Sequence, residues 1–141
     1  MKRFLLPLLV LPAMATAETK LIDTSLLPAR TVYDVAELTP LALTAEGAPA
    51  MLLLSVDAGD VVPPHATQSG LRLLTVLSGE MSWGDGDAVD EGVERRFGPG
   101  SVLAVQAGDM HWVAARSGPV QIQLVLLDDE TPVTGIQEQL Q

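Results

Sequence analysis

Short apolar runs separated by glycine and proline, at intervals of about ten residues, are the feature that most constrains the fold of this sequence. The breaks between the runs are turn sequences such as Ser78-Gly79-Glu80 and Gly98-Pro99-Gly100. Aliphatic and β-branched runs with this spacing are typical of an all-β sandwich or barrel. The runs are Ala50–Asp57, Leu71–Ser78, Gly79–Trp83, Val93–Phe97, Ser101–Gln106, His111–Arg116 and Pro119–Leu127.

The last long run also alternates as a strand with one buried face would. Ile122 and Leu124 would face one side of it, and Gln123 the other. Residues 18–48 show no strong period, and only residues 31–35 suggest a short strand. There is no sustained helical pattern with caps, no internal repeat and no linker. The sequence therefore predicts a single all-β domain.

The N-terminus has the order of a secretory signal peptide. Residues 1–3 are a short basic start, residues 4–11 are apolar, and residues 15–17 have the small-x-small pattern that signal peptidase reads. The apolar run is shorter than the roughly 20 residues of a membrane-spanning helix. The alternative is a first buried strand or helix. We expect cleavage after Ala17 and a mature domain over residues 18–141, free of the membrane and located in a bacterial periplasm.

Charge and cysteine content exclude several functions. The chain has 18 acidic and 8 basic residues, and loss of Lys2 and Arg3 would take the net charge to about −12. Such a surface repels phosphate backbones and anionic lipids, so neither nucleic-acid binding nor membrane-surface binding is expected. The chain has no cysteine. Disulfides, thiolate metal sites and cysteine nucleophiles are therefore excluded.

The two histidines, His65 and His111, occupy similar places in the pattern. His65 follows Pro63-Pro64, which stiffens the chain before the imidazole. His111 follows a glycine turn and opens a predicted strand. Rigid strand ends at a barrel mouth are where imidazoles can converge on a metal or ligand. The alternative is that each histidine is an ordinary hydrogen-bonded structural or surface residue.

The spacing of glycines around the two histidines resembles the two motifs of the cupin superfamily. The first motif reads Gly59, five residues, His65-Ala66-Thr67, four residues, Arg72, six residues, Gly79; the second reads Gly100, five residues, Gln106-Ala107-Gly108, two residues, His111, three residues, Ala115. The motifs cover residues 59–115, and the segments 82–87 and 97–101 are similar to those of small exported bacterial cupins. The resemblance implies an antiparallel β-barrel of the double-stranded β-helix, jelly-roll type. It also implies a homodimer, for which Pro119–Leu127 would be a suitable partner-facing edge strand.

Metal-binding cupins hold their ion with two histidines and a glutamate from the first motif and one histidine from the second. His65 and His111 match this set, whereas Thr67 stands at the second histidine position and Arg72 at the glutamate position. A hydroxyl is a weak ligand for a divalent metal, and a guanidinium cannot ligate one. The sequence therefore predicts a degraded metal site. If the loop after His65 shifts its register by one residue, Gln68 would take the place of the second histidine and offer an amide oxygen as a ligand.

Arg72 suggests another use for the cavity. Its side chain would share the inward face of its strand with Leu74 and Val76. A guanidinium beside imidazoles can hold a carboxylate or another small anion. The alternative is that Arg72 pairs with Glu80 or Asp109 and completes a polar network.

Three functions from different classes follow from these patterns. The favoured one is a binding or sensing module that holds a small molecule, such as a carboxylate, at His65, Arg72 and His111. The second is a metal-dependent cupin enzyme (a dioxygenase, isomerase or lyase) whose divalent metal is held by the two histidines with Gln68 or Thr67. The third is a dimeric structural or assembly protein. A fold that serves so many activities does not decide between them.

Overall fold

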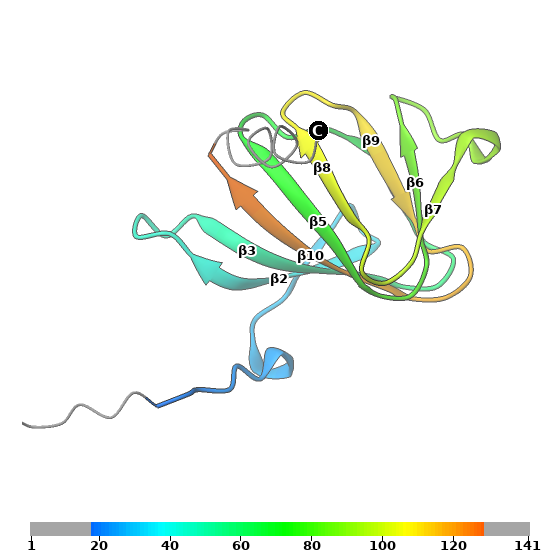
Figure 1. The fold of residues 1–141 in the computed structure, drawn as a ribbon. Coiled ribbons are helices and arrows are strands. Elements are labelled where there is room, and N and C mark those ends of the chain that lie inside the picture. Colours follow the sequence, from blue (N-terminus) through cyan, green and yellow to red (C-terminus); the bar gives the residue numbers. More distant parts are fainter. Residues whose placement is uncertain (1–17, 129–141) are drawn as a thin grey trace, which may run out of the picture.

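The computed structural model describes residues 18–128, and nearly all regular structure in this range is β-strand (Figure 1). The helical segments within it are two 3-10 turns, η1 (Thr24–Leu26) and η2 (Glu91–Val93). No helix among these residues is long and apolar enough to span a bilayer. The predicted signal peptide, residues 1–17, and the last part of the predicted domain, residues 129–141, lie outside the described residues. The strands are β1 (Arg30–Val32), β2 (Ala36–Leu43), β3 (Pro49–Val56), β4 (Val61–His65), β5 (Leu71–Ser78), β6 (Met81–Asp85), β7 (Arg95–Phe97), β8 (Val102–Gln106), β9 (His111–Ala114) and β10 (Val120–Leu127).

These strands form two antiparallel sheets that face each other (Figure 1). The larger sheet has the order β1-β2-β3-β10-β5-β8, and the smaller has the order β4-β9-β6-β7. The predicted all-β, antiparallel class of double-stranded β-helix is confirmed. The sheets are not joined into a closed ring of hydrogen-bonded strands, so the barrel is formed by two facing layers.

The core fills the space between the two sheets. Val76 and Ile122 come from the large sheet, and Met81 and Val113 come from the small one; each is at most 2% exposed. Leu124 packs against the same cluster, as the alternation along the last strand predicts. Burial of aliphatic side chains from both layers stabilises this arrangement, because each sheet covers the apolar face of the other.

One turn shows why a motif glycine is required. Gly79, between β5 and β6, has a φ of 77°. A Cβ atom at this position would also overlap the backbone carbonyl oxygen of Pro119. A residue with a side chain would therefore be strained in its backbone and would clash with the loop before β10.

Three details differ from the sequence-based expectation. The eight-residue strand β2 lies within the segment that shows no strong period. The Pro63-Pro64 pair lies inside β4, which tolerates it because β4 is an edge strand with a register shift between Val62 and His65. The prediction that Pro119–Leu127 is an edge strand is wrong, because β10 pairs with β3 on one side and β5 on the other. The homodimer stays a prediction, and its interface cannot be an edge of β10.

Candidate functional site

His65 and His111 meet across the small sheet. They are register partners at the ends of the antiparallel strands β4 and β9. The centroids of the two imidazole rings are 4.4 Å apart, and the ring planes are inclined by 58°. The two motifs therefore bring their histidines into contact, as their position at strand ends predicts.

Each imidazole is oriented by a backbone carbonyl two residues earlier. Nδ1 of His65 lies 2.9 Å from the carbonyl oxygen of Pro63, and Nδ1 of His111 lies 2.8 Å from that of Asp109. Because a carbonyl oxygen can only accept a hydrogen bond, each Nδ1 carries the hydrogen. In the neutral rings the lone pair therefore lies on Nε2, which remains available to a ligand.

Two further aromatic rings extend the histidine pair into a row. Tyr33 lies 4.9 Å from His65 between ring centroids, and Trp83 lies 4.5 Å from His111, nearly parallel to it. Trp83 is 2% exposed and belongs to the core. Sequence reasoning missed Tyr33, which comes from the turn between β1 and β2 and has a φ of 54°. No motif marks that turn, so the printed sequence carries no signal for it.

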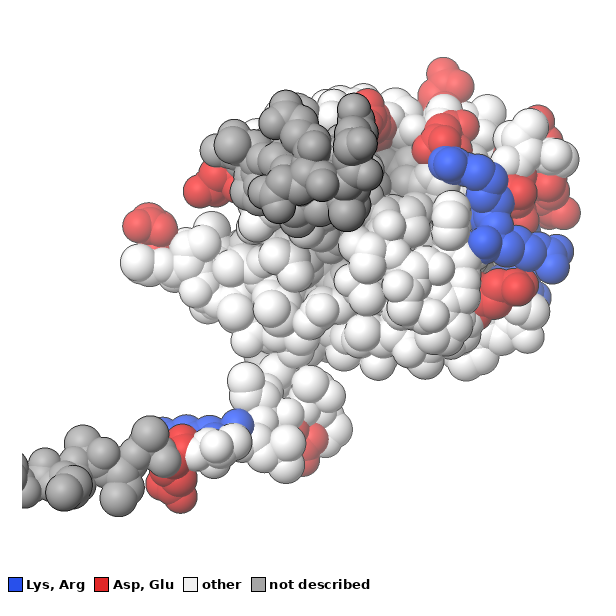
Figure 2. Space-filling model, viewed as in Figure 1, with Lys and Arg blue, Asp and Glu red and all other residues white. Residues whose placement is uncertain are grey.

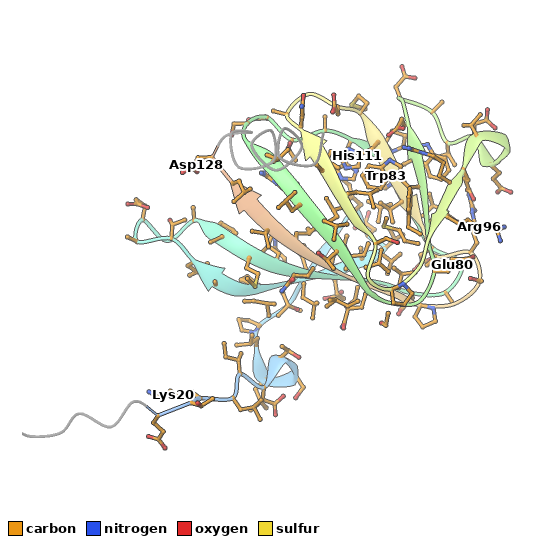
Figure 3. The ribbon with its side chains drawn as sticks, viewed as in Figure 1. Lys20, Glu80, Trp83, Arg96, His111 and Asp128 are labelled. Atoms are coloured by element: carbon orange, nitrogen blue, oxygen red, sulfur yellow. The ribbon has the colours of Figure 1, made fainter. Side chains whose placement is uncertain are left out.

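The environment of His111 favours its neutral form. The residue is 5% exposed, and this burial lowers the pKa of His111 below its ordinary value of 6.5. The carbonyl of Asp109 opposes the shift, while the nearby His65 lowers the pKa further. Figure 3 shows His111 and Trp83 between the two sheets.

Arg72 is the charged residue of a small cavity next to the histidines. The cavity has a volume of about 80 Å³ and is lined by Leu54, His65, Thr67, Arg72, Leu74, His111, Val113 and Leu124. Arg72 and Leu74 line it together, as the predicted inward face of the strand requires. Nη1 of Arg72 donates to the carbonyl oxygen of Ser69 at 3.4 Å. Burial lowers the pKa of Arg72 below its ordinary value, but a guanidinium stays charged at neutral pH.

No acidic side chain within residues 18–128 forms an ion pair with Arg72. The alternative pairing with Glu80 is wrong, since Glu80 pairs with Arg96 at 3.5 Å. The pairing with Asp109 is also wrong, because the Asp109 carboxylate forms no ion pair with Arg72; its backbone carbonyl oxygen lies near Nδ1 of His111. Figure 2 shows exposed basic side chains on one side of the molecule, intermixed with acidic ones. Arg72 thus differs from these paired surface arginines.

Of the two other predicted metal ligands, Thr67 lies at the cavity and Gln68 lies outside it. Thr67 lines the cavity, and its Oγ1 is buried with no hydrogen-bond partner. Gln68 is exposed and does not line it. Within the described part of the chain, no three His, Cys, Asp or Glu side chains gather closely enough to hold a metal ion. The structure brings together two imidazoles, one hydroxyl and one guanidinium.

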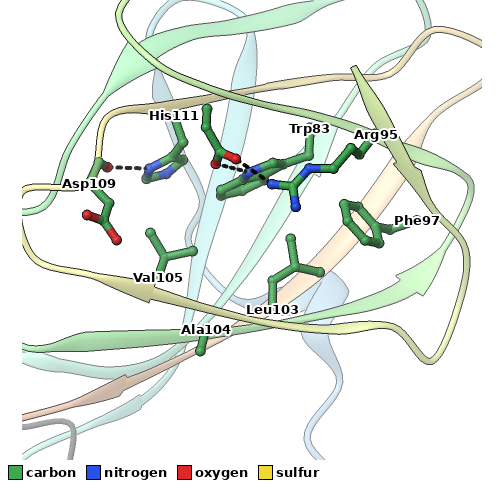
Figure 4. A pocket seen from close by; sticks show the side chains of 9 residues that line it. Trp83, Arg95, Phe97, Leu103, Ala104, Val105, Asp109 and His111 are labelled. Atoms are coloured by element: carbon green, nitrogen blue, oxygen red, sulfur yellow. Dashed lines mark hydrogen bonds and ion pairs between the residues drawn. The ribbon is translucent and has the colours of Figure 1, made fainter. Parts of the chain in front are cut away.

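Three larger hollows share lining residues with this cavity: one shares His65, one shares His111, and a third, of about 190 Å³, shares Arg72 and includes Ser69 and Asp128. The hollow on the His65 side has a volume of about 400 Å³ and is mainly apolar. The hollow on the His111 side has a volume of about 250 Å³ and includes Asp85 and Asp109 (Figure 4). There the carboxylate of Asp85 accepts hydrogen bonds from the indole nitrogen of Trp83 at 2.8 Å and from Arg95 at 2.5 Å.

Comparison with known proteins supports the fold. No family model matches this sequence, and no curated protein matches it significantly. Among solved structures, a predicted oxalate decarboxylase from Thermotoga maritima is similar at 16% identity and a TM-score of 0.59, covering 77% of this chain and 99% of that one. A cupin superfamily protein from Desulfitobacterium hafniense is similar at 25% identity and a TM-score of 0.54, covering 80% and 94%.

A third structure, the polyketide cyclase RemF from Streptomyces resistomycificus, is similar at 17% identity and a TM-score of 0.61, covering 78% of this chain and 80% of that one. The chain therefore has the fold of the cupin superfamily, as its two motifs predict. Similar structures include proteins described as a lyase and as a sugar phosphate isomerase. Since one fold serves several reactions, the function has to be argued from the side chains of the cavity.

Proposed function

We propose that this chain is an exported binding or sensing protein whose cavity holds a small carboxylate between Arg72, His65 and His111. The observation that carries the proposal is the partly buried guanidinium of Arg72, which donates to the Ser69 carbonyl oxygen but forms no ion pair with an acidic side chain of residues 18–128. A charge removed from water is costly unless an opposite charge or hydrogen-bond acceptors meet it. A bound carboxylate would supply both, because its two oxygens match the guanidinium in charge and in planar geometry.

The groups around Arg72 suit the same ligand. The buried Oγ1 of Thr67 has no partner and can donate a hydrogen bond to a carboxylate oxygen. A bound anion would also raise the pKa of His111, since it favours the charged imidazole. Nε2 of His111 would then carry a hydrogen and donate to the ligand. Binding should therefore be coupled to uptake of a proton by His111.

The metal that the fold implies suits this donor set less well, and we propose that the metal site is degraded. Only His65 and His111 in the cavity are good ligands for a divalent ion, and no carboxylate joins them. Arg72 lines the same cavity, and its positive charge would oppose a second one nearby.

The binding test compares Arg72 with a surface arginine. Titration calorimetry with acetate, oxalate and benzoate measures affinity in the parent protein and in Arg72→Met. Arg96→Met is the matched control, because Arg96 is 64% exposed and lies outside the cavity. We expect Arg72→Met to weaken binding at least tenfold and Arg96→Met to leave it unchanged. Equal affinities in all three proteins, or no binding to the parent, would rule out the proposal.

One observation favours a second candidate, a metal-dependent enzyme. Both histidines donate Nδ1–H to a carbonyl oxygen, an arrangement that commonly orients metal-binding histidines. The test is the metal content of the mature protein from its native compartment, compared with the His65→Ala, His111→Ala double variant. Stoichiometric iron, manganese, nickel or zinc that is lost in the variant would favour this candidate over carboxylate binding.

Export to the periplasm belongs to the same proposal. It rests on the basic start, the apolar run and the small-x-small pattern of residues 1–17. Mass spectrometry of the protein from separated cell fractions identifies its N-terminal residue in each compartment. We expect the periplasmic protein to begin at Glu18, whereas an intact N-terminus in the cytoplasmic fraction would contradict export.

A further inference from the structure

The cavity at Arg72 is too small for an organic ligand much larger than acetate. One water molecule occupies about 30 Å³ in the liquid, so a cavity of about 80 Å³ holds a carboxylate group and little more. Any larger carboxylate must therefore place the rest of its body in a neighbouring hollow. The hollow that shares Arg72 with the cavity also has Asp128 in its lining, whose charge would repel an anionic ligand. The chemistry of the other two hollows decides between them.

The hollow on the His65 side adjoins the Arg72 cavity, and the two share three lining residues. Leu54, His65 and Leu124 line both. Its volume of about 400 Å³ is within the range of pockets that bind small molecules. The other side chains around it are Arg30, Val32, Tyr33, Leu38, Leu52 and Val62. Six of the nine lining residues are aliphatic, and none is acidic.

The hollow on the His111 side is less suitable for the body of an anionic ligand. Asp85 and Asp109 line it together with Arg95, which pairs with Asp85, so the charge of Asp109 is left to repel a carboxylate. Trp83 also stacks against His111 on this side, at 4.5 Å between ring centroids. His111 is the one lining residue that this hollow shares with the Arg72 cavity.

We infer that the ligand is an amphipathic monocarboxylate, an inference that rests on the proposed function of the Arg72 cavity. The carboxylate lies at Arg72 and Thr67, and an aliphatic or aromatic body passes His65 into the apolar hollow between the β1–β2 turn and strands β2, β3, β4 and β10. The apolar lining of the hollow favours ligands with an apolar body, while Arg72 favours ligands with a negative charge.

The inference predicts that affinity rises with the length of the apolar body. Burial of one methylene contributes enough to tighten binding about fourfold. Each step from acetate to butanoate, hexanoate and octanoate adds two methylenes, so calorimetry should show a gain of roughly fifteenfold per step until the hollow is filled. Arg72→Met should weaken the binding of every member of the series.

Two variants of strand β2 separate the apolar hollow from the rest of the surface. Leu38 lines the hollow, whereas Leu43, at the end of the same strand, is 59% exposed and does not. We expect Leu38→Asn to weaken octanoate binding at least fivefold and to leave acetate binding unchanged. Leu43→Asn should change neither, and circular dichroism of both variants checks that they fold. The length series in the parent protein needs no variant, so a misfolded Leu38→Asn would not decide the result.

The possible outcomes separate the two proposals. Equal affinity along the series, with acetate binding still dependent on Arg72, would overturn the amphipathic ligand and keep the carboxylate site. No binding of any carboxylate would overturn both. Tighter binding of the dicarboxylate adipate than of hexanoate would also overturn the inference, since Arg30 at the hollow would then hold a second charge.

Discussion

The indole of Trp83 stacks on the imidazole of His111, with ring centroids 4.5 Å apart and ring planes 10° from parallel. His65 lies 4.4 Å from His111. The imidazole of His111 is therefore enclosed by two rings and has little contact with water. This enclosure links the protonation of His111 to whatever occupies the neighbouring cavity.

The first prediction concerns the titration of His111. Burial lowers the pKa of His111 below 6.5, and the charge of His65 contributes to the shift. In His65→Gln the pKa of His111 should rise, because one repelling charge is absent. Saturating acetate should also raise it in the parent protein, because an anion favours imidazolium. NMR spectra of the ring protons as a function of pH measure both shifts. An unchanged titration with acetate would contradict an anion at the histidine pair.

Stability should depend on pH through the same residue. The pKa of His111 is lower in the folded chain than its ordinary value, so below about pH 6.5 the unfolded chain binds a proton that the folded chain does not. The contribution of His111 to the free energy of unfolding should therefore fall as the pH drops from 6.5 towards the folded pKa, and then level off. Urea unfolding at pH 8, 6 and 5 should show a smaller pH effect in His111→Gln. Parallel curves for the two proteins would contradict this.

The contact between Gly84 and Trp112 predicts a large cost for one added methyl group. A Cβ atom at Gly84 would overlap the indole of Trp112, which is fully buried. We expect Gly84→Ala to lower the free energy of unfolding by about 1–3 kcal/mol, because the indole has no room to move. Gly98→Ala is the control, since a Cβ there meets nothing within 4 Å. Urea denaturation should show that the free energy of unfolding of Gly98→Ala stays within about 0.5 kcal/mol of the parent value. Similar losses in both variants would indicate a general glycine effect instead.

A buried ion pair and an exposed one predict different outcomes for two arginines. Nε and Nη2 of Arg116 donate to one oxygen of Glu94 at 2.9 and 2.6 Å, and the Glu94 side chain is 7% exposed. The same carboxylate raises the pKa of Arg116. Arg116→Met should destabilise the fold by about 2 kcal/mol, because it leaves Glu94 without its main partner.

The matched control is Arg96→Met, which removes the exposed pair with Glu80. This variant should change stability by about 0.5 kcal/mol or less, since solvent screens surface pairs. Thermal and urea unfolding of the two variants make the comparison. If Arg96→Met costs as much as Arg116→Met, burial of Glu94 is not the cause.

The sequence predicts which residues line the cavity better than it predicts the strands and ion pairs around the cavity. Spacing places His65, Thr67, Arg72 and His111 together because glycine turns and strand lengths fix where each strand ends. The tertiary partners of Arg72 depend on side-chain directions across two sheets, so spacing alone cannot show that Glu80 pairs with Arg96 instead.

The N-terminal part of the site is the least predictable. Tyr33 reaches His65 from a turn with a left-handed backbone, and no local pattern marks this contact. Strand β2 gives no clean period because it is covered on only part of its length, and its last two residues are exposed. For the same reason the apolar hollow beside His65, to which Val32 and Leu38 contribute, has no signature in the sequence.

The central place of β10 has a consequence for how the chain folds. Ile122 pairs with Leu54 in β3 and with Val76 in β5, so the last described strand joins segments that are distant in sequence. Contacts of this kind form slowly, because a long loop must close before they stabilise anything. During synthesis β3 and β5 lack their common neighbour until residue 127 has emerged. The nascent chain therefore cannot complete its larger sheet early, and its open strand edges must be kept from aggregating until that moment.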